Sequence, residues 1–202
     1  MRFFSKNEAI GVLIILSVVF IFTFSGLKTS LRRARDAQRQ ADLSSVSDAL
    51  YTFQAEFGFF PPSEDGKVKA CKDSDFDEVI IKLRELEDFD RNLYFEGLRG
   101  CDWGYDGLRD VTDDTYPPYL MSLPSDPKQE EGFSYFYISN TKRFQLYSYL
   151  EGEDEENTYN SGVVSRNLAC GTKICSFGKS SGDTPLDISI EDYERKLENE
   201  NP

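Results

Sequence analysis

The sequence predicts an α+β protein in which a long N-terminal α-helix packs on a small antiparallel β-sheet head with loop insertions and disulfides. Three observations support this fold class. An uncharged apolar segment at 9–27 runs directly into an amphipathic helical pattern at 28–57. Two adjacent β-prone segments follow at 133–150, and four cysteines lie outside the apolar segment.

The apolar segment 9–27 reads AIGVLIILSVVFIFTFSGL and contains no charged residue. As a helix rising ~1.5 Å per residue it would span ~28 Å, which is about the hydrocarbon thickness of a bilayer. We therefore expect a retained transmembrane helix behind a short leader-like segment at 1–8. The alternative is a cleaved signal peptide, for which residues 25–30 would supply the small-residue cleavage site.

Residues 28–57 continue the helical pattern without a helix breaker. Apolar residues at intervals of three and four share one face, which predicts that this half of the helix lies against the head. These residues are Leu43, Val46, Leu50, Phe53 and Phe57. Small side chains are expected to continue the same face towards the membrane, at Ala34, Ala37 and Ala41. Gly58 and the following Pro61-Pro62 should end the helix. The alternative is a break at Gly26 that separates an anchor from a surface helix.

The charge is unevenly distributed along the chain. Residues 1–42 carry seven basic and three acidic residues, whereas the whole chain has a net charge of −13. The acidic remainder argues against nucleic acid as a partner, because phosphate binding needs a basic face. Basic residues that follow the apolar segment would place the head in the cytoplasm by the positive-inside rule. The acidic composition and the cysteines favour the opposite, extracytoplasmic side.

Composition also restricts catalysis. The chain has no His, so Ser-His-Asp and Cys-His mechanisms are excluded and the commonest metal ligand is missing. We expect a protein that is not an enzyme. The competing hypothesis is a membrane-anchored hydrolase that uses paired carboxylates, for which the candidates are Asp102, Asp106, Asp113 and Asp114. Acidic residues are abundant here, so a solvated acidic loop is the favoured interpretation.

Four cysteines in a modest domain indicate two disulfides and an oxidising compartment. Of the three connectivities, we favour Cys71–Cys101 and Cys170–Cys175, because each pair encloses one local insertion. The alternative is a zinc site of four thiolates, but the spacing lacks the usual two-to-four-residue knuckle on both sides.

The head is expected to span 58–185, followed by a polar tail at 186–202. Ser74 should open a short helix with Asp77 as its capping-box partner, and 88–118 should form an irregular insertion. The segments 133–139 and 143–150 predict a β-hairpin that turns at Asn140-Thr141. A third short strand is expected at 162–164. In the tail, a polar helix is expected over 189–198.

The order of these features resembles the type IV pilin and type II secretion pseudopilin family. The stretch ARDAQRQADL at 34–43 is similar to the region after the membrane helix of many pseudopilins, and FGFFP at 57–61 is similar to their helix exit. LPSDP at 123–127, FSY at 133–135 and FQLYSYLE at 144–151 resemble the segments that form their sheet. CSFGKSSGDTP at 175–185 is similar to the C-terminal loop of some bacterial members. The insertion at 66–118 has no counterpart.

The resemblance implies assembly residues at the N-terminus. Family members begin their mature chain with Phe and carry Glu at its fifth position, which corresponds to Phe4 and Glu8 here; Phe3 stands where members usually have Gly. A prepilin peptidase would process the leader before Phe4. Glu8 would then pair with the amino terminus of a neighbouring subunit, since an unpaired carboxylate at the edge of hydrocarbon is costly. The alternative without a partner places Glu8 among the lipid headgroups.

The resemblance further implies a structural subunit of a pilus-like or pseudopilus filament, with an extracytoplasmic head and single-pass membrane insertion. Its partners would be other copies of itself, other pilin-like subunits and, indirectly, an assembly ATPase and membrane platform. Some pseudopilins bind calcium near the C-terminal loop, for which Asp126, Asp183 and Asp187 are candidate ligands. The alternative function is a membrane-anchored binding or adhesion protein that does not polymerise.

Overall fold

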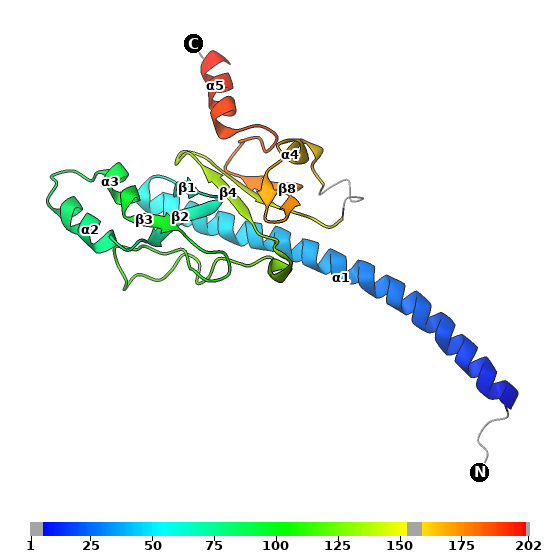
Figure 1. The fold of residues 1–202 in the computed structure, drawn as a ribbon. Coiled ribbons are helices and arrows are strands. Elements are labelled where there is room, and N and C mark those ends of the chain that lie inside the picture. The colour runs from blue at the N-terminus through cyan, green and yellow to red at the C-terminus, as the bar shows by residue number, and fades with distance from the viewer. Residues whose placement is uncertain (1–5, 153–158, 201–202) are drawn as a thin grey trace.

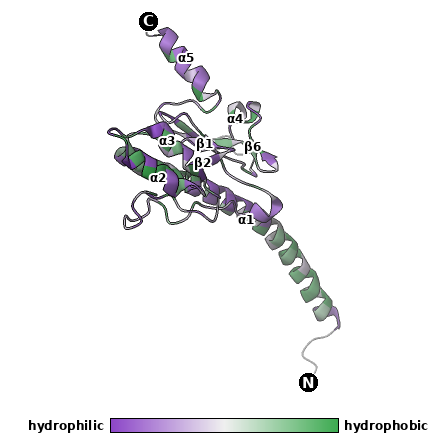
Figure 2. Ribbon diagram, turned by 60° about the vertical axis from the view of Figure 1, so that its left-hand side comes forward, coloured by the Kyte–Doolittle hydropathy of each residue, from purple (hydrophilic) through white to green (hydrophobic). Residues whose placement is uncertain are grey.

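The computed structural model describes residues 6–152 and 159–200, and the fold is α+β, as predicted. Helix α1 (Lys6–Phe57) is one continuous helix of 52 residues, so the chain does not break at Gly26. Its C-terminal half lies along the head, and its N-terminal half extends away from it (Figure 1). The projecting half is strongly hydrophobic, whereas the head is mixed (Figure 2).

The C-terminal half of α1 forms the centre of the hydrophobic core. Leu43, Val46, Leu50 and Phe53 are at most 1% exposed, which confirms the predicted apolar face. The expectation that small residues continue this face was wrong, because Ala34, Ala37 and Ala41 are exposed. Successive residues of a helix are about 100° apart, so Ala41, two residues before Leu43, lies on the opposite side of the helix. Ala34 and Ala37 stand in the same relation to the buried residues Asp36 and Arg39.

The sheet that contacts α1 has the strand order β4-β5-β8, with both pairings antiparallel. The predicted hairpin is formed by β4 (Phe136–Ser139) and β5 (Phe144–Ser148), and the third strand is β8 (Phe177–Ser180). In the register, Tyr137 is opposite Leu146. Strands β5 and β8 both lie against α1. The buried faces of this sheet and of α1 therefore share one core.

The third strand does not lie where the sequence predicted it. Residues 162–164 belong to the short helix α4 (Ser161–Ser165) instead. Asn160 caps this helix, because its side chain accepts hydrogen bonds from the backbone N–H groups of Gly162 and Val163. An Asn cap satisfies the first free N–H groups of a helix, which outweighs the β-propensity of two valines.

A second antiparallel sheet, with the order β1-β2-β3, is formed by β1 (Ser63–Glu64), β2 (Lys67–Lys72) and β3 (Leu98–Gly100). Helices α2 (Phe76–Arg84) and α3 (Arg91–Glu96) connect β2 to β3 and form the end of the head remote from the projecting helix (Figure 1). The segment 88–118 is thus more regular than expected, because pairing with β2 organises its first part.

The predicted capping box of the short helix does not form. Helix α2 begins at Phe76, and Asp75 occupies the N-cap position without a side-chain hydrogen bond. The backbone N–H of Ser74 instead donates a hydrogen bond to the Asp73 carboxylate at 2.7 Å.

Both predicted disulfides are present, between Cys71 and Cys101 and between Cys170 and Cys175. The first links β2 to the residue after β3 and so closes the insertion. The second closes the tight hairpin of β6 (Ala169–Cys170) and β7 (Lys173–Ile174).

The remaining elements are the 3₁₀ turn η1 (Gln129–Glu131) and helix α5 (Ile190–Glu200). Helix α5 confirms the helix that was predicted in the polar tail.

Candidate functional site: the projecting half of α1 and its junction with the head

The projecting half of α1 exposes a continuous apolar surface. Leu13, Phe20 and Ile21 are 63%, 68% and 66% exposed. Among the described side chains of this segment, further exposed large apolar ones are Ile10, Val12, Ile14, Ile15, Leu16, Val18, Val19, Phe24, Leu27 and Leu31. The helix is long and apolar enough to cross a membrane by length and composition. A surface of this kind needs lipid or other protein chains to cover it.

Two hydroxyl groups in this half do not interrupt the apolar surface. Ser17 donates a hydrogen bond to the carbonyl of Leu13, and Thr23 donates one to the carbonyl of Val19, both at 2.8 Å. Because these hydroxyls are satisfied within the helix, they need no partner from outside. The segment can therefore enter an apolar environment without leaving these two groups unpaired.

A buried ionic cluster, centred on Arg39, lies where α1 leaves the head. The guanidinium of Arg39 is fully buried and forms a bidentate ion pair with Asp126: Nε donates to Oδ2 at 2.8 Å and Nη2 donates to Oδ1 at 3.0 Å. Its Nη1 also donates to Asp36 at 2.8 Å and to Glu151 at 3.0 Å. Arg39 thus joins α1 to two loops of the head that are distant in sequence.

Neighbouring groups complete the cluster. Arg35 donates to both carboxylate oxygens of Glu151, at 2.7 and 2.6 Å. The Asp36 carboxylate accepts hydrogen bonds from the backbone N–H groups of Glu151 and Gly152, at 2.9 and 3.0 Å. Lys128 lies 3.6 Å from Glu151. The carboxylates of this junction are therefore held by charge-assisted hydrogen bonds.

The electrostatics of the cluster favour the charged forms of Glu151 and Arg39. The hydrogen bonds from Arg35 lower the pKa of Glu151 to about 2; burial opposes this shift and Arg39 adds to it. For Arg39, burial disfavours the charged form, but the hydrogen bonds and charge of Asp126 outweigh it and raise the pKa above its ordinary value. A buried ion pair contributes little net stability compared with apolar packing, but it fixes geometry and is costly to break. The cluster therefore sets how α1 is positioned on the head.

Polar contacts further along α1 repeat this attachment. The Tyr135 hydroxyl donates to Asp42 at 2.5 Å, and Lys179 donates to the Ser44 hydroxyl at 3.2 Å. Near the end of the helix, the backbone N–H of Gly182 donates to the Tyr51 hydroxyl at 2.9 Å. Burial raises the pKa of Asp42, although the bond from Tyr135 acts against it. The head thus holds α1 along its whole buried half.

The residues that sequence analysis proposed for assembly lie at the start of α1. Glu8 is exposed in the first turn of the helix, where a carboxylate is favoured by the helix dipole. Phe4 lies outside the described residues.

The proposed calcium ligands do not gather in one place. Asp126 is 4% exposed, with both oxygens bonded to Arg39, whereas Asp183 and Asp187 are exposed. Within 6–152 and 159–200, the only cluster of three potential metal-ligating residues combines Asp106 with the disulfide-bonded Cys71 and Cys101. Calcium binding stays a prediction.

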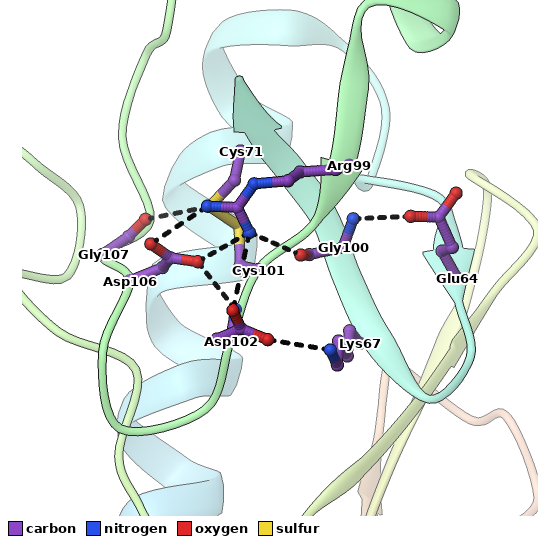
Figure 3. Close-up of a disulfide and its surroundings, with 9 residues drawn as sticks. All are labelled: Glu64, Lys67, Cys71, Arg99, Gly100, Cys101, Asp102, Asp106 and Gly107. Carbon is purple, nitrogen blue, oxygen red and sulfur yellow. Dashed lines mark hydrogen bonds and ion pairs between the residues drawn. A yellow bond between two sulfur atoms is a disulfide. The ribbon is translucent and has the colours of Figure 1, made fainter. Parts of the chain in front are cut away.

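Of the four carboxylates of the hydrolase hypothesis, Asp102, Asp106 and Asp114 are engaged in local ion pairs, and Asp113 accepts hydrogen bonds from Thr115. Around the Cys71–Cys101 disulfide, Asp106 accepts from Arg99 at 2.9 Å, and Asp102 pairs with Lys67 at 2.8 Å (Figure 3). Burial raises the pKa of Asp106. The hydrogen bonds from the backbone N–H of Asp102 and from Arg99 outweigh burial, so the pKa lies below its ordinary value. A catalytic acid needs the opposite shift, so this arrangement suits a structural role.

Sequence analysis missed the role of Arg39, although the sequence carries a signal. Arg39 precedes Leu43 by four residues and therefore extends the buried stripe of α1 by one position. A charged residue at such a position requires a buried partner, which Asp126 supplies. The pattern indicates that Arg39 is buried, but it cannot identify a partner 87 residues away.

The fold and the site together define a protein with a projecting apolar N-terminal helix, a disulfide-bonded α+β head and a pilin-like topology. No family model, curated protein or solved structure matches the chain.

Proposed function

We propose that this chain is the structural subunit of a type IV pilus-like or type II secretion pseudopilus-like filament, which assembles through the projecting half of α1. The observation that carries the proposal is the division of one continuous helix into a buried half and a half with exposed apolar side chains. In the membrane, lipid covers the exposed half. In a filament, the corresponding helices of neighbouring copies cover it.

The junction supports this function mechanically. A filament subunit must transmit force between its helix and its head, so the helix must not rotate relative to the head. The bidentate ion pair between Arg39 and Asp126 fixes both the position and the rotation of α1 relative to the head, because the guanidinium is planar and its donors are directional. A flexible linker at this point would instead suit a simple membrane anchor.

The exposed small side chains of α1 fit the same function. Ala34, Ala37 and Ala41 face away from the head, just beyond the apolar segment. Small side chains at this level allow the helix of another copy to approach closely. The resulting contact joins different surfaces of two copies, and such an interface continues into an open helical polymer when its rotation does not close a ring.

In this proposal the chain catalyses no reaction. Its partners are further copies of itself, other pilin-like subunits and the membrane that stores it before assembly. An assembly ATPase acts from the cytoplasm through a membrane platform, and a prepilin peptidase processes the N-terminus. The head lies outside the cytoplasm, which agrees with its two disulfides.

The test is Glu8→Ala in the cell that produces the protein. The expected result is a chain that has both disulfides and a folded head. Electron micrographs of material sheared from the cell surface should show no filaments. Asp48→Ala is the matched control, because Asp48 is also an exposed acid on α1 but lies in the half of the helix that packs on the head. Filaments in normal number from Glu8→Ala would contradict the proposal.

A non-polymerising anchored protein is the second candidate, because lipid alone would also cover the exposed apolar half of α1. It predicts that the unmodified chain forms no filament and that Glu8→Ala changes nothing. The same micrographs therefore distinguish the two functions.

A further inference from the structure

We propose that, in the filament, the acidic tip of one head docks on a basic segment of α1 in a second copy of the chain. This contact rests on the proposed function and is one interface of that filament. The basic segment is 28–35, and the acidic tip consists of the exposed side chains of 73–90, which include α2. The tip lies at the end of the molecule remote from the projecting half of α1 (Figure 1).

The basic segment begins directly after the apolar segment. Its sequence, KTSLRRAR, contains four basic residues and no acidic one, in a chain with a net charge of −13. Arg35 is bonded to Glu151 of its own head, and Lys28 and Arg33 are exposed. Leu31, one helical turn after Lys28, is 50% exposed. The basic segment therefore presents positive charge together with apolar surface.

The acidic tip has the opposite charge. Residues 73–90 include eight acidic and two basic residues, so the net charge of this segment is −6. Glu85 and Asp88 are exposed and form no ion pair within the described part of the chain. Ile81, one turn before Glu85, is 59% exposed, and Leu86 is 46% exposed. The tip therefore presents negative charge together with apolar surface, which complements the basic segment of another copy.

The geometry of α1 sets the offset between two such copies. Residues 33 and 57 are separated by about 36 Å at a rise of about 1.5 Å per residue, so a chain cannot join its own tip to its own basic segment. A parallel copy that is shifted along the helix axis by about this distance has its basic segment beside the tip of the first copy. The same shift places the start of its apolar segment beside Ala34, Ala37 and Ala41 of the first copy, which face away from the head.

One offset therefore satisfies the charges and also covers apolar surface. Because the contact joins two different surfaces, each copy that uses its tip keeps its basic segment for the next copy. Such an interface does not close on itself and can continue along a polymer.

The basic segment has a competing occupant in anionic lipid headgroups, because basic residues just beyond a membrane span attract them. The acidic tip has no such alternative, since anionic lipid repels it. A contact between copies requires both surfaces, whereas lipid binding requires the basic segment alone. Charge reversal on each surface in turn distinguishes the two.

The first test reverses the charge of the tip in the cell that produces the protein. Glu85→Lys combined with Asp88→Lys should still give both disulfides, because both positions are exposed, but should lower the number of filaments in electron micrographs by about tenfold or more. Glu191→Lys combined with Glu198→Lys makes the same change of charge at exposed positions of α5. This matched control should leave the number of filaments unchanged. Equal numbers from the tip variant and the unmodified chain, or equal losses from the tip variant and the control, would overturn the proposed contact.

The second test exchanges the signs of the two surfaces. Lys28→Glu combined with Arg33→Glu should also reduce the number of filaments. The chain with all four substitutions should recover most of them, because an acidic segment of α1 then meets a basic tip. A loss confined to the variant of the basic segment would assign that segment to lipid and overturn the contact, and so would the absence of recovery.

The unmodified chain separates this contact from the proposed function. If it forms filaments and the charge variants behave otherwise than expected, the contact alone is wrong and the proposed function stands. If it forms none, both are wrong.

Discussion

The two halves of α1 have the same secondary structure but opposite relations to their surroundings. In the half that lies on the head, Leu50 is fully buried and Arg39 is enclosed by carboxylates. In the projecting half, Leu16 is 59% exposed and the described side chains make no comparable contact with the head. Both halves contain large apolar residues, but 9–27 has no charged residue, whereas 28–57 has many. What differs is whether polar residues alternate with them at helical spacing.

This difference separates two functions within one helix. The buried half is a structural part of the head, and its removal would open the core. The projecting half contributes nothing to that core and is free to contact lipid or other chains. Substitutions in the two halves should therefore have different effects on folding and on assembly, and the following predictions test that separation in order of expected size.

Arg39→Met should have the largest effect on the head. The variant leaves Asp126, Asp36 and Glu151 close together without their shared cation, and breaking a buried ion pair typically costs about 3–5 kcal/mol. Chemical denaturation of the full chain in detergent measures the loss. Arg33→Met, at an exposed position of the same helix, is the control and should change the free energy of unfolding by less than about 1 kcal/mol. Similar values for both variants would refute a special role for the junction.

Leu50→Ala and Leu16→Ala compare the two halves directly. Leu50→Ala should destabilise the head by about 2–5 kcal/mol, because it leaves a cavity in the core. Leu16→Ala should leave head unfolding unchanged, since Leu16 lies in the projecting half. The measurement is the same denaturation series. A destabilised head in Leu16→Ala would mean that the projecting half contributes to the core.

The junction should also weaken in acid. Because the pKa of Glu151 is lowered from 4.5 to about 2 in the folded protein, its stabilising contribution is complete above pH 4.5 and is lost as the pH falls towards 2. The loss attributable to Glu151 should be about 2–3 kcal/mol. Unfolding free energies across this range should fall less steeply in Glu151→Gln than in the unmodified chain. Asp42, whose pKa is raised, is common to both proteins and cancels in the difference. Parallel curves would contradict the assignment.

Gly26→Ala should have the smallest effect. Apart from the chain neighbours and the local helix backbone, no described atom lies within 4 Å of the position that a Cβ would take, and alanine stabilises a helix interior by about 0.5–1 kcal/mol relative to glycine. Amide hydrogen exchange around residue 26 should slow, whereas unfolding of the head should not change. Faster exchange would indicate that the helix bends or opens at this glycine.

The sequence predicted those parts of the fold that depend on local pattern. Helix α1, the β4–β5 hairpin and the helix in the tail follow from residue periodicity and propensity within one segment. Strand β8 was missed because its sequence, FGKS, has little β-propensity, and pairing with β5 produces it. Strand β3 was missed for the same reason, since it depends on β2 and the Cys71–Cys101 link.

The candidate site divides in the same way. The apolar character of 9–27 could be predicted from composition, and the position of Arg39 in the buried stripe was visible in the sequence. Its partners could not be predicted, because Asp126 and Glu151 reach it only through the tertiary fold. Asp126 was therefore considered as a calcium ligand, whereas in the structure it is the main counter-ion of Arg39.

The most direct test of the central claim is cross-linking between the projecting halves of α1. The described chain has no free cysteine, so Leu13→Cys and Ile15→Cys add two thiols about 200° apart around the helix. After oxidation of cells that produce the double variant, the account predicts a ladder of covalent oligomers longer than dimers, whereas either single variant gives dimers at most. Only monomers and dimers from a correctly folded double variant would contradict it.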